Sequence, residues 1–268
     1  MTELFGRQII IEIGEPGGEA RRWTELRISG RVEKSPARSP NTCIIEVYNP
    51  SPVAIALAQV RGVVVRVLAG HSVPRLLFTG TVNKGGAVLA KQGVDRVLTI
   101  EATDGGRRFQ EAHVNQTFSR ELTAEQVFGI LADAMGLPLG AVQVGEDVRF
   151  SGVSVVGPVR DALDDLVRSI GARWSVQDGA LQVLTDDEDT GEAVVVVSAK
   201  SGNLIGSPSP TDDGIEFTAL LDGRIRPGRR VILESEQYKG TYRAREVQHV
   251  FDSGWEDSFY TVVTGRAA

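Results

Sequence analysis

The sequence predicts a mainly β protein in which two antiparallel β regions flank a small α+β insert. Three features of the 268 residues support this prediction. Short apolar stretches recur about every 15 residues or less through the first hundred residues, as they do in a sandwich or barrel. Apolar residues at helical spacing follow between 123 and 171, and strand-like stretches resume after residue 193. The predicted domain boundaries are therefore 1–105, 106–190 and 191–268.

The first β region is expected to contain strands at 26–32, 43–49, 63–70, 76–82 and 96–103. Cys43, Ile45 and Val47 alternate with more polar residues, which is typical of a half-buried strand, so Cys43 is expected to pack as a small core residue. A proline-rich break occupies 34–41. Residues 51–60 predict one short helix, because Ser51 can cap it and Pro52 suits its first turn.

The insert is expected to hold two helices and a hairpin. Thr123 and Gln126 form a capping-box pattern, and Gly136 ends the apolar stripe of this first helix. Pro158 sits at a plausible first position of the second helix, which runs to Gly171. In the stretch 173–184, Asp178-Gly179 is the preferred pair for a type I′ turn, which places Val176 opposite Leu181 and Trp174 opposite Val183. One further strand is expected near 142–150.

The second β region follows an acidic, turn-rich joint at 185–192. Strands are expected at 194–198, 215–221, 230–235, 241–250 and 258–265. Pro227-Gly228 and Asp252-Ser253-Gly254 mark turns between them.

The two β regions show signs of being copies of one unit. Each has an apolar strand (63–70 or 230–235), then a Gly-Thr pair (Gly80-Thr81 or Gly240-Thr241), then a closing strand with Thr between apolar residues. Two similar β modules in one chain allow three chains to form a quasi-sixfold ring. The predicted function depends on this repeat.

Composition and charge exclude several classes of protein. The formal net charge is −6 and the pI is about 5.3, which argues against a broad face that binds nucleic acid phosphates. No stretch of about 18 apolar residues predicts a membrane span, and the acidic N-terminus does not resemble a signal peptide. The chain is therefore expected to be made in a cytoplasm. The single cysteine excludes a disulfide framework within the chain and a multi-cysteine zinc site.

Catalytic chemistry has little support in the sequence. His71, His113 and His249 have no histidine or cysteine at metal-ligand spacing, so we expect all three to be structural or surface residues. There is no nucleophile elbow and no phosphate-binding glycine loop. We therefore predict no enzyme activity, no catalytic or cofactor-binding residues, no cofactor and no metal site. A carboxylate pair for glycoside cleavage stays possible for strands of this kind, although nothing favours it.

Other polar and aromatic groups have simple interpretations. The acidic stretch 185–192 and Asp212-Asp213 are expected to be solvated loops. Trp23, Trp174 and Trp255 are spread evenly along the chain, which favours core or subunit contacts over stacking on sugars. The paired arginines 21–22, 107–108 and 229–230 are expected to form salt bridges at subunit contacts or to solvate loops.

Several stretches resemble the phage baseplate hub proteins of the late control protein D type. GNLIGSP (202–208), RPGRRV (226–231), KGTYRAREVQH (239–249) and DSGWEDSFY (252–260) are similar to the C-terminal half of that family. The hairpin SIGARWSVQDGALQV (169–183) also resembles it. The stretch from 48 to 70, followed by LFTGTV (77–82), is similar to the family's first barrel.

The resemblance implies two tube-like antiparallel β-barrel domains, 1–105 and 191–268, around a helix-containing middle domain. It further implies a homotrimer that forms a pseudo-hexameric ring in the virion tail baseplate. This ring joins a sixfold tail tube or distal tail protein to a threefold spike, and DNA passes through its channel without specific binding. A net acidic lumen would repel phosphate and let DNA slide. Since no spike or lysozyme-like domain follows residue 268, a separate spike protein is expected.

Two alternatives remain open at this point. A cell-wall glycan-binding or hydrolase module requires clustered exposed aromatic residues and a carboxylate pair in a cleft. A tail tube or distal tail protein belongs to the same structural class as the hub but forms a hexamer.

Overall fold

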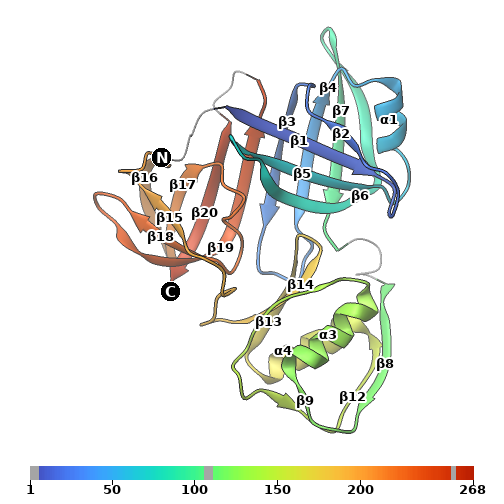
Figure 1. Cartoon of the computed structure of the whole chain (residues 1–268), viewed down its shortest axis with the longest axis vertical. Helices are drawn as coiled ribbons and strands as arrows, with labels where there is room; N and C mark the ends of the chain where they lie inside the picture. The colour runs from blue at the N-terminus through green and yellow to red at the C-terminus, as the bar shows by residue number, and fades with distance from the viewer. Residues whose placement is uncertain (1–5, 106–110, 255–257) are drawn as a thin grey trace.

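The computed structural model describes residues 6–105, 111–254 and 258–268. Within these ranges, antiparallel sheets dominate and three helices are present (Figure 1). The predicted fold class, mainly β with a small helical insert, is confirmed. No helix in the described ranges has the length and apolar character needed to cross a bilayer.

The N-terminal β unit comprises seven strands and one helix. They are β1 (Arg7–Gly14), β2 (Arg21–Trp23), β3 (Ile28–Lys34), β4 (Thr42–Tyr48), α1 (Pro52–Ala58), β5 (Val64–His71), β6 (Arg75–Gln92) and β7 (Asp95–Thr103). Every strand expected here is present, and Ser51 caps α1 by accepting a hydrogen bond from the Ala54 amide at 3.2 Å. Strand β1 was not expected, although Ile9, Ile11 and Ile13 alternate into the core.

The middle unit contains two helices packed on three small sheets. Its elements are β8 (His113–Phe118), β9 (Leu122–Thr123), α3 (Ala124–Met135), β10 (Leu139–Gln143), β11 (Arg149–Phe150), β12 (Val153–Pro158), α4 (Val159–Ser169), β13 (Ala172–Gln177) and β14 (Ala180–Thr185). The capping box of Thr123 and Gln126 is present, and Gly136 ends α3 with φ 67°. Pro158 is the N-cap of α4 rather than its first helical residue. Two short strands, β10 and β11, replace the single strand expected near 142–150.

The Asp178-Gly179 hairpin is confirmed in detail. Asp178 and Gly179 have φ values of 53° and 82°, the pair of positive values that a type I′ turn requires. Val176 pairs with Leu181 and Trp174 with Val183, and all four side chains are buried. The local sequence alone therefore determines this register.

The C-terminal β unit consists of six strands. They are β15 (Val195–Ser198), β16 (Leu204–Thr211), β17 (Gly214–Leu220), β18 (Arg230–Glu234), β19 (Lys239–Asp252) and β20 (Phe259–Ala267). All five predicted strands are present. Strand β16 was missed because Pro208 and Pro210 argue against a strand. It is an edge strand that pairs only with β17, and proline is tolerated at such a position.

The two β units share one strand order. The sheet order is β3-β4-β7-β6-β5-β1 in the N-terminal β unit and β16-β17-β20-β19-β18-β15 in the C-terminal β unit. Strands at equivalent positions of the two units also occur in the same order along the chain. One pairing differs, because β1 is antiparallel to β5 whereas β15 is parallel to β18. The repeat predicted from the sequence is thus confirmed at the level of strand order.

Both units also contain a long strand that leaves one of its two partners near a β-bulge. Strand β6 pairs with β5 as far as Thr81, and its register to β7 shifts between Val82 and Ala87. Strand β19 pairs with β18 as far as Arg243, and its register to β20 shifts between Ala244 and Glu246. Beyond the bulge, β19 pairs with β3 and joins both units into one 13-stranded sheet.

Three groups of buried apolar residues form the cores of these units. The largest lies in the N-terminal β unit and includes Leu221, Phe251 and Phe259 from the C-terminal β unit. The others lie within the middle unit and within the C-terminal β unit. The middle unit lies at one end of the molecule, with the β13–β14 hairpin directed at the two β units (Figure 1). Domain boundaries at 105 and 190 stay a prediction.

We predict that Gly30→Ala weakens the joint between the two β units. Gly30 lies opposite Phe251 in the β3–β19 pair, and a Cβ there would sit 2.7 Å from Phe251 Cζ and overlap the Ile44 carbonyl oxygen. Overpacking of this kind costs about 1–3 kcal/mol, which urea unfolding measures. Gly129→Ala in α3 is the matched control. Its Cβ meets only Leu139 Cδ2 at 3.7 Å, so stability should rise by about 0.5–1 kcal/mol. Equal effects of the two substitutions would contradict the packing argument.

Candidate functional site: a buried junction and two apolar patches

A buried ion pair lies where the three units meet. Lys34 at the end of β3 places its Nζ 2.5 Å from Asp178 Oδ1 at the hairpin tip, and the two side chains are 0% and 8% exposed. Arg226, in the connection before β18, lies 3.6 Å from the other Asp178 oxygen. One carboxylate of the middle unit therefore sits between a cation from each β unit. Burial strengthens this attraction and makes each charge costly to leave unpaired.

An amide and carboxylate network surrounds this ion pair. Asn41 donates its backbone N–H and its Nδ2 to the two oxygens of Asp104, at 2.8 and 2.7 Å. The same Nδ2 lies 2.9 Å from the Val176 carbonyl oxygen, and Gln177 Nε2 donates to the Ser35 carbonyl at 2.8 Å. Burial raises the pKa of Asp104 to about 7, while the Asn41 bonds and the charge of Lys34 oppose this rise. The network attaches the hairpin to the N-terminal β unit.

Ion pairs also fix the joint between the middle and C-terminal units. Glu192 contacts Arg226 and Arg229, both at 2.6 Å, and Asp189 contacts Arg230 at 2.8 Å. Arg229 additionally donates to the Ala193 carbonyl oxygen. The expectation that the acids at 185–192 only solvate a loop is wrong for Asp186, Asp189 and Glu192, because the fold places arginines of β13, of the β17–β18 connection and of β18 beside them.

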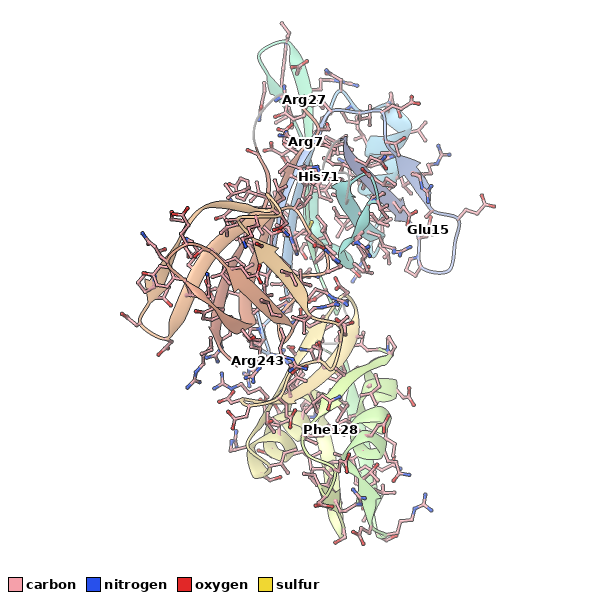
Figure 2. All side chains as sticks on the ribbon, turned by 60° about the vertical axis from the view of Figure 1, so that its left-hand side comes forward. Arg7, Glu15, Arg27, His71, Phe128 and Arg243 are labelled. Atoms are coloured by element: carbon pink, nitrogen blue, oxygen red, sulfur yellow. The ribbon has the colours of Figure 1, made fainter. Side chains whose placement is uncertain are left out.

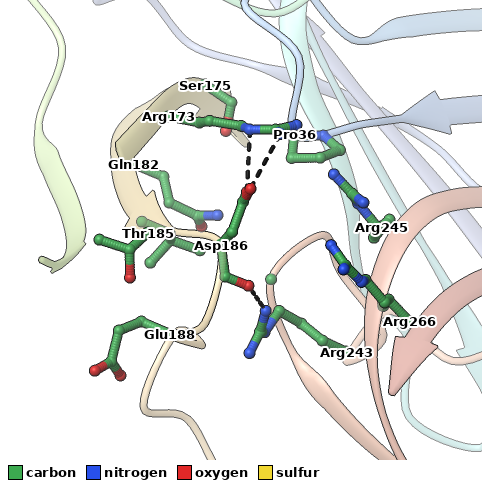
Figure 3. Close-up of a pocket in the computed structure, with 13 residues that line it drawn as sticks. Pro36, Arg173, Ser175, Gln182, Thr185, Asp186, Glu188, Arg243, Arg245 and Arg266 are labelled. Carbon is green, nitrogen blue, oxygen red and sulfur yellow. Dashed lines mark hydrogen bonds and ion pairs between the residues drawn. The ribbon is translucent and has the colours of Figure 1, made fainter. Parts of the chain in front are cut away.

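A narrow arginine-lined cleft separates the hairpin from the C-terminal β unit (Figure 3). Arg173, Arg243, Arg245 and Arg266 line a cavity of about 50 Å³. Arg243 donates to the backbone carbonyl oxygens of Asp186 and Asp187, and Arg173 lies 3.0 Å from the Asp186 carboxylate. A cavity of this size holds only a few water molecules. The cleft therefore serves as a joint rather than as a substrate pocket.

The three histidines lie apart from one another. His249 is fully buried in β19, its Nδ1 is 2.9 Å from Thr261 Oγ1, and burial lowers its pKa to about 3. His71, the last residue of β5, is labelled in Figure 2. It packs edge-on against Phe259 with ring centroids 5.0 Å apart, and burial lowers its pKa. His113 is exposed at the start of β8. These are the structural and surface positions expected for them.

No group of three or more potential metal ligands occurs among the described residues. Cys43 is buried as expected, and burial raises the pKa of its thiol. It therefore has the environment of a core residue and not of a nucleophile.

Two of the three tryptophans are core residues. Trp23 and Trp174 are buried, and Trp174 Nε1 donates to Asp164 Oδ1 at 2.8 Å. Neither forms the exposed platform that sugar stacking requires, and Trp255 lies outside the described residues. Of the paired arginines, Arg22 contacts Glu12 at 2.7 Å within the chain, and residues 107–108 lie outside the described ranges.

Eight of the ten exposed large apolar side chains among the described residues lie in two parts of the fold, which we call patches, and Val73 and Val156 lie elsewhere. The α1–hairpin patch lies on α1 and the β6–β7 hairpin and consists of Val53, Val60, Val88, Leu89 and Val94. The β15–β16 patch consists of Val194, Val196 and Ile205. The two patches lie far apart, because α1 and β16 are on opposite sides of the two β units (Figure 1). These side chains provide apolar surface that is open to contact.

Sequence reasoning identified the hairpin turn but not the junction that it serves. In the sequence, Lys34 and Asn41 lie at the two ends of the proline-rich break 34–41, and Asp104 lies where the composition changes between the first β region and the insert. A lysine that closes an alternating strand carries no signal of burial, since its partner lies 144 residues away.

Comparisons with known proteins agree on the fold. No family model matches the chain, and no curated protein sequence is similar to it. Among solved structures, the 43 kDa tail protein of prophage MuSo2 from Shewanella oneidensis superposes with a TM-score of 0.66 at 10% identity, over 98% of each chain. The tail protein from Neisseria meningitidis MC58 gives 0.66 at 12% identity, over 97% of this chain and 96% of that one.

A third similar structure comes from a secretion system. The E. coli c3393 protein, described as a component of the type VI secretion system, gives a TM-score of 0.55 at 13% identity, over 91% of this chain and 73% of that one. These likenesses establish that the chain has the fold of phage tail proteins. The predicted resemblance to a tail and baseplate family is thus confirmed at the level of the fold.

We predict that Lys34 and Asp178 are strongly coupled. Lys34→Met should lower the free energy of unfolding by about 3–5 kcal/mol, because it leaves Asp178 buried without its closest cation. Asp178→Asn, which tolerates the turn conformation, should cost less in the Lys34→Met background than in the wild type. Urea unfolding of the four proteins gives the coupling. The exposed Lys239→Met is the control and should change stability by at most about 0.5 kcal/mol, and additive effects at 34 and 178 would contradict the ion pair.

We also predict that Asp104 gives the protein a distinctive pH dependence. Its pKa is about 7 in the folded chain and 3.8 in the unfolded chain, so between these pH values the folded state holds one more proton than the unfolded state. Its contribution to stability is therefore full below about pH 4 and is lost as the pH rises through 7.

Comparison with Asp104→Asn isolates this contribution, because His249 acts in the opposite direction over the same range. Relative to Asp104→Asn, the wild type should lose unfolding free energy between pH 4 and 7. The exposed Asp212→Asn is the control, and the same pH profile for the wild type and Asp104→Asn would contradict the prediction.

Proposed function

We propose that the chain is a structural hub of a phage tail baseplate or of a related injection machine. In this proposal three copies form a pseudo-hexameric ring that joins a sixfold tail tube, or a distal tail protein, to a threefold spike. The ring surrounds a channel through which DNA passes without specific binding. The hub is a virion component that is assembled in the host cytoplasm, has no enzymatic role, and works with a separate spike protein.

The observation that carries the proposal is the shared strand order of the two β units. A closed ring built from a single β unit needs six identical chains to match a sixfold tube. A chain with two such units presents six similar modules with only three copies, so one ring can meet a sixfold and a threefold partner. The tail and secretion proteins that superpose on the chain support this assignment to an injection apparatus.

Surface chemistry is compatible with this role. The net charge of −6 disfavours tight contact with DNA phosphates, as a conduit requires. The described tryptophans are buried, so the alternative of a glycan-binding or hydrolase module gains no support. The two apolar patches provide surface for contacts between copies.

The test is the mass of the assembly in solution across a range of protein concentrations, measured by native mass spectrometry or by light scattering after gel filtration. We expect three chains, because two similar units per chain complete a quasi-sixfold ring at that number. Six chains would instead indicate a tube or distal tail protein. A monomer at every concentration and in the presence of a tube protein would overturn the proposal.

A further inference from the structure

We infer that the ring is closed by head-to-tail contact, in which the β6–β7 hairpin of one copy packs against β16 and the start of β15 of the next copy. This inference rests on the proposed function and adds the surfaces through which the copies meet. The occupant of each apolar patch is thus the other patch of a second copy of this chain.

The joint inside the chain provides the template for this contact. Beyond its bulge, β19 pairs with β3, from Val247 opposite Lys34 to Asp252 opposite Ser29. In the shared strand order, β6 corresponds to β19 and β16 corresponds to β3. The contact that repeats the internal joint therefore places the distal part of β6, Ala87–Gln92, beside β16 of a neighbouring copy.

Both of these segments have a free edge, meaning an edge without a strand partner, in the described chain, although Gln59 Nε2 donates to the Ala87 carbonyl oxygen at 3.5 Å. Strand β6 leaves β5 at Thr81, and from Ala87 onward it pairs with β7 alone. Strand β16 pairs with β17 alone. A ring whose repeating unit is one β unit would fill both edges at once, whereas the separate chain leaves them open.

Apolar exposure coincides with these free edges. Val88 and Leu89 are 54% and 37% exposed. Because consecutive strand residues point to opposite faces, exposure of both means that neither face of the hairpin is covered. Val94 at its tip is 95% exposed, and Ile205 on β16 is 41% exposed. Since the patches lie on opposite sides of the two β units, contact between unlike patches is heterologous. Heterologous contacts close into a ring when the rotation between copies divides a full turn, as a threefold rotation does.

The prolines of β16 limit which strands this edge accepts. Thr211 and Gly214 flank a two-residue turn and form its hydrogen-bonded closing pair. Hydrogen-bonded and non-hydrogen-bonded pairs alternate along an antiparallel ladder, so the N–H and C=O positions of Pro210 and Ile215 in the next pair point away from each other. The missing N–H of Pro210 therefore falls on the free edge, which offers a carbonyl oxygen without a donor. Proline protects edge strands from arbitrary strand addition. The contact between copies is accordingly carried by apolar side chains, with backbone bonds that run from β6 donors to β16 carbonyls.

Cysteine crosslinking tests the geometry directly. Leu89→Cys and Ile205→Cys are made singly and together, and a short bis-maleimide joins accessible thiols. The wild type is the blank, since its only cysteine, Cys43, is buried. We expect the double variant to form covalent species that end at three chains. Neither single variant should crosslink alone, and a mixture of the two single variants should form covalent dimers only.

The matched control replaces Leu89→Cys by Val73→Cys, which is exposed but lies outside both patches. Paired with Ile205→Cys, it should give no crosslinked product. Crosslinking of a single variant to itself would indicate contact between like patches and overturn the inference. A trimer by mass whose double variant does not crosslink would overturn the inference and leave the proposed function standing. A persistent monomer would overturn both.

Discussion

The position of the middle unit against the two β units depends on a buried polar junction centred on the ion pair between Lys34 and Asp178. It brings a carboxylate of the middle unit to the end of β3, and Arg226 of the C-terminal β unit approaches the same carboxylate. Buried charges of this kind contribute less to net stability than to specificity, because every misplaced arrangement leaves a charge without its partner. The three hydrophobic cores give each unit its stability, the β3–β19 pair joins the two β units, and the polar junction holds the middle unit against them.

The duplicated β unit explains why the joint within the chain and the free surfaces of the chain resemble each other. In the N-terminal β unit, the long strand β6 extends past its first partner and ends in an exposed hairpin. In the C-terminal β unit, the equivalent extension of β19 is covered by β3 and contributes Phe251 to the neighbouring core. The extension of the long strand therefore forms the joint inside the chain in one unit, and its equivalent in the other unit stays exposed at the surface.

Local signals predicted most of the fold, and long-range contacts account for what they missed. Thr123 with Gln126 and Asp178 with Gly179 determine their structures within a few residues, so both were predictable. Strand β16 was hidden because the tolerance of Pro208 and Pro210 depends on its place at a sheet edge. The junction was hidden because Lys34 and Asp104 acquire partners only when distant segments meet. Burial of a charged residue is a property of the tertiary fold, and the residues next to it in the sequence do not predict it.

The pairing of β3 with β19 also sets the order in which the molecule can mature. Val32 and His249 are opposite each other in that pair, so the ribosome must synthesise more than 200 further residues after β3 before this ladder can form. Contacts between residues so distant in sequence slow folding, because chain entropy is lost before the contact stabilises anything. Until then β3 presents one open edge, and the nascent N-terminal unit is exposed to mispairing with other chains. The joint between the two β units therefore forms only after all the strands of the N-terminal β unit have been synthesised.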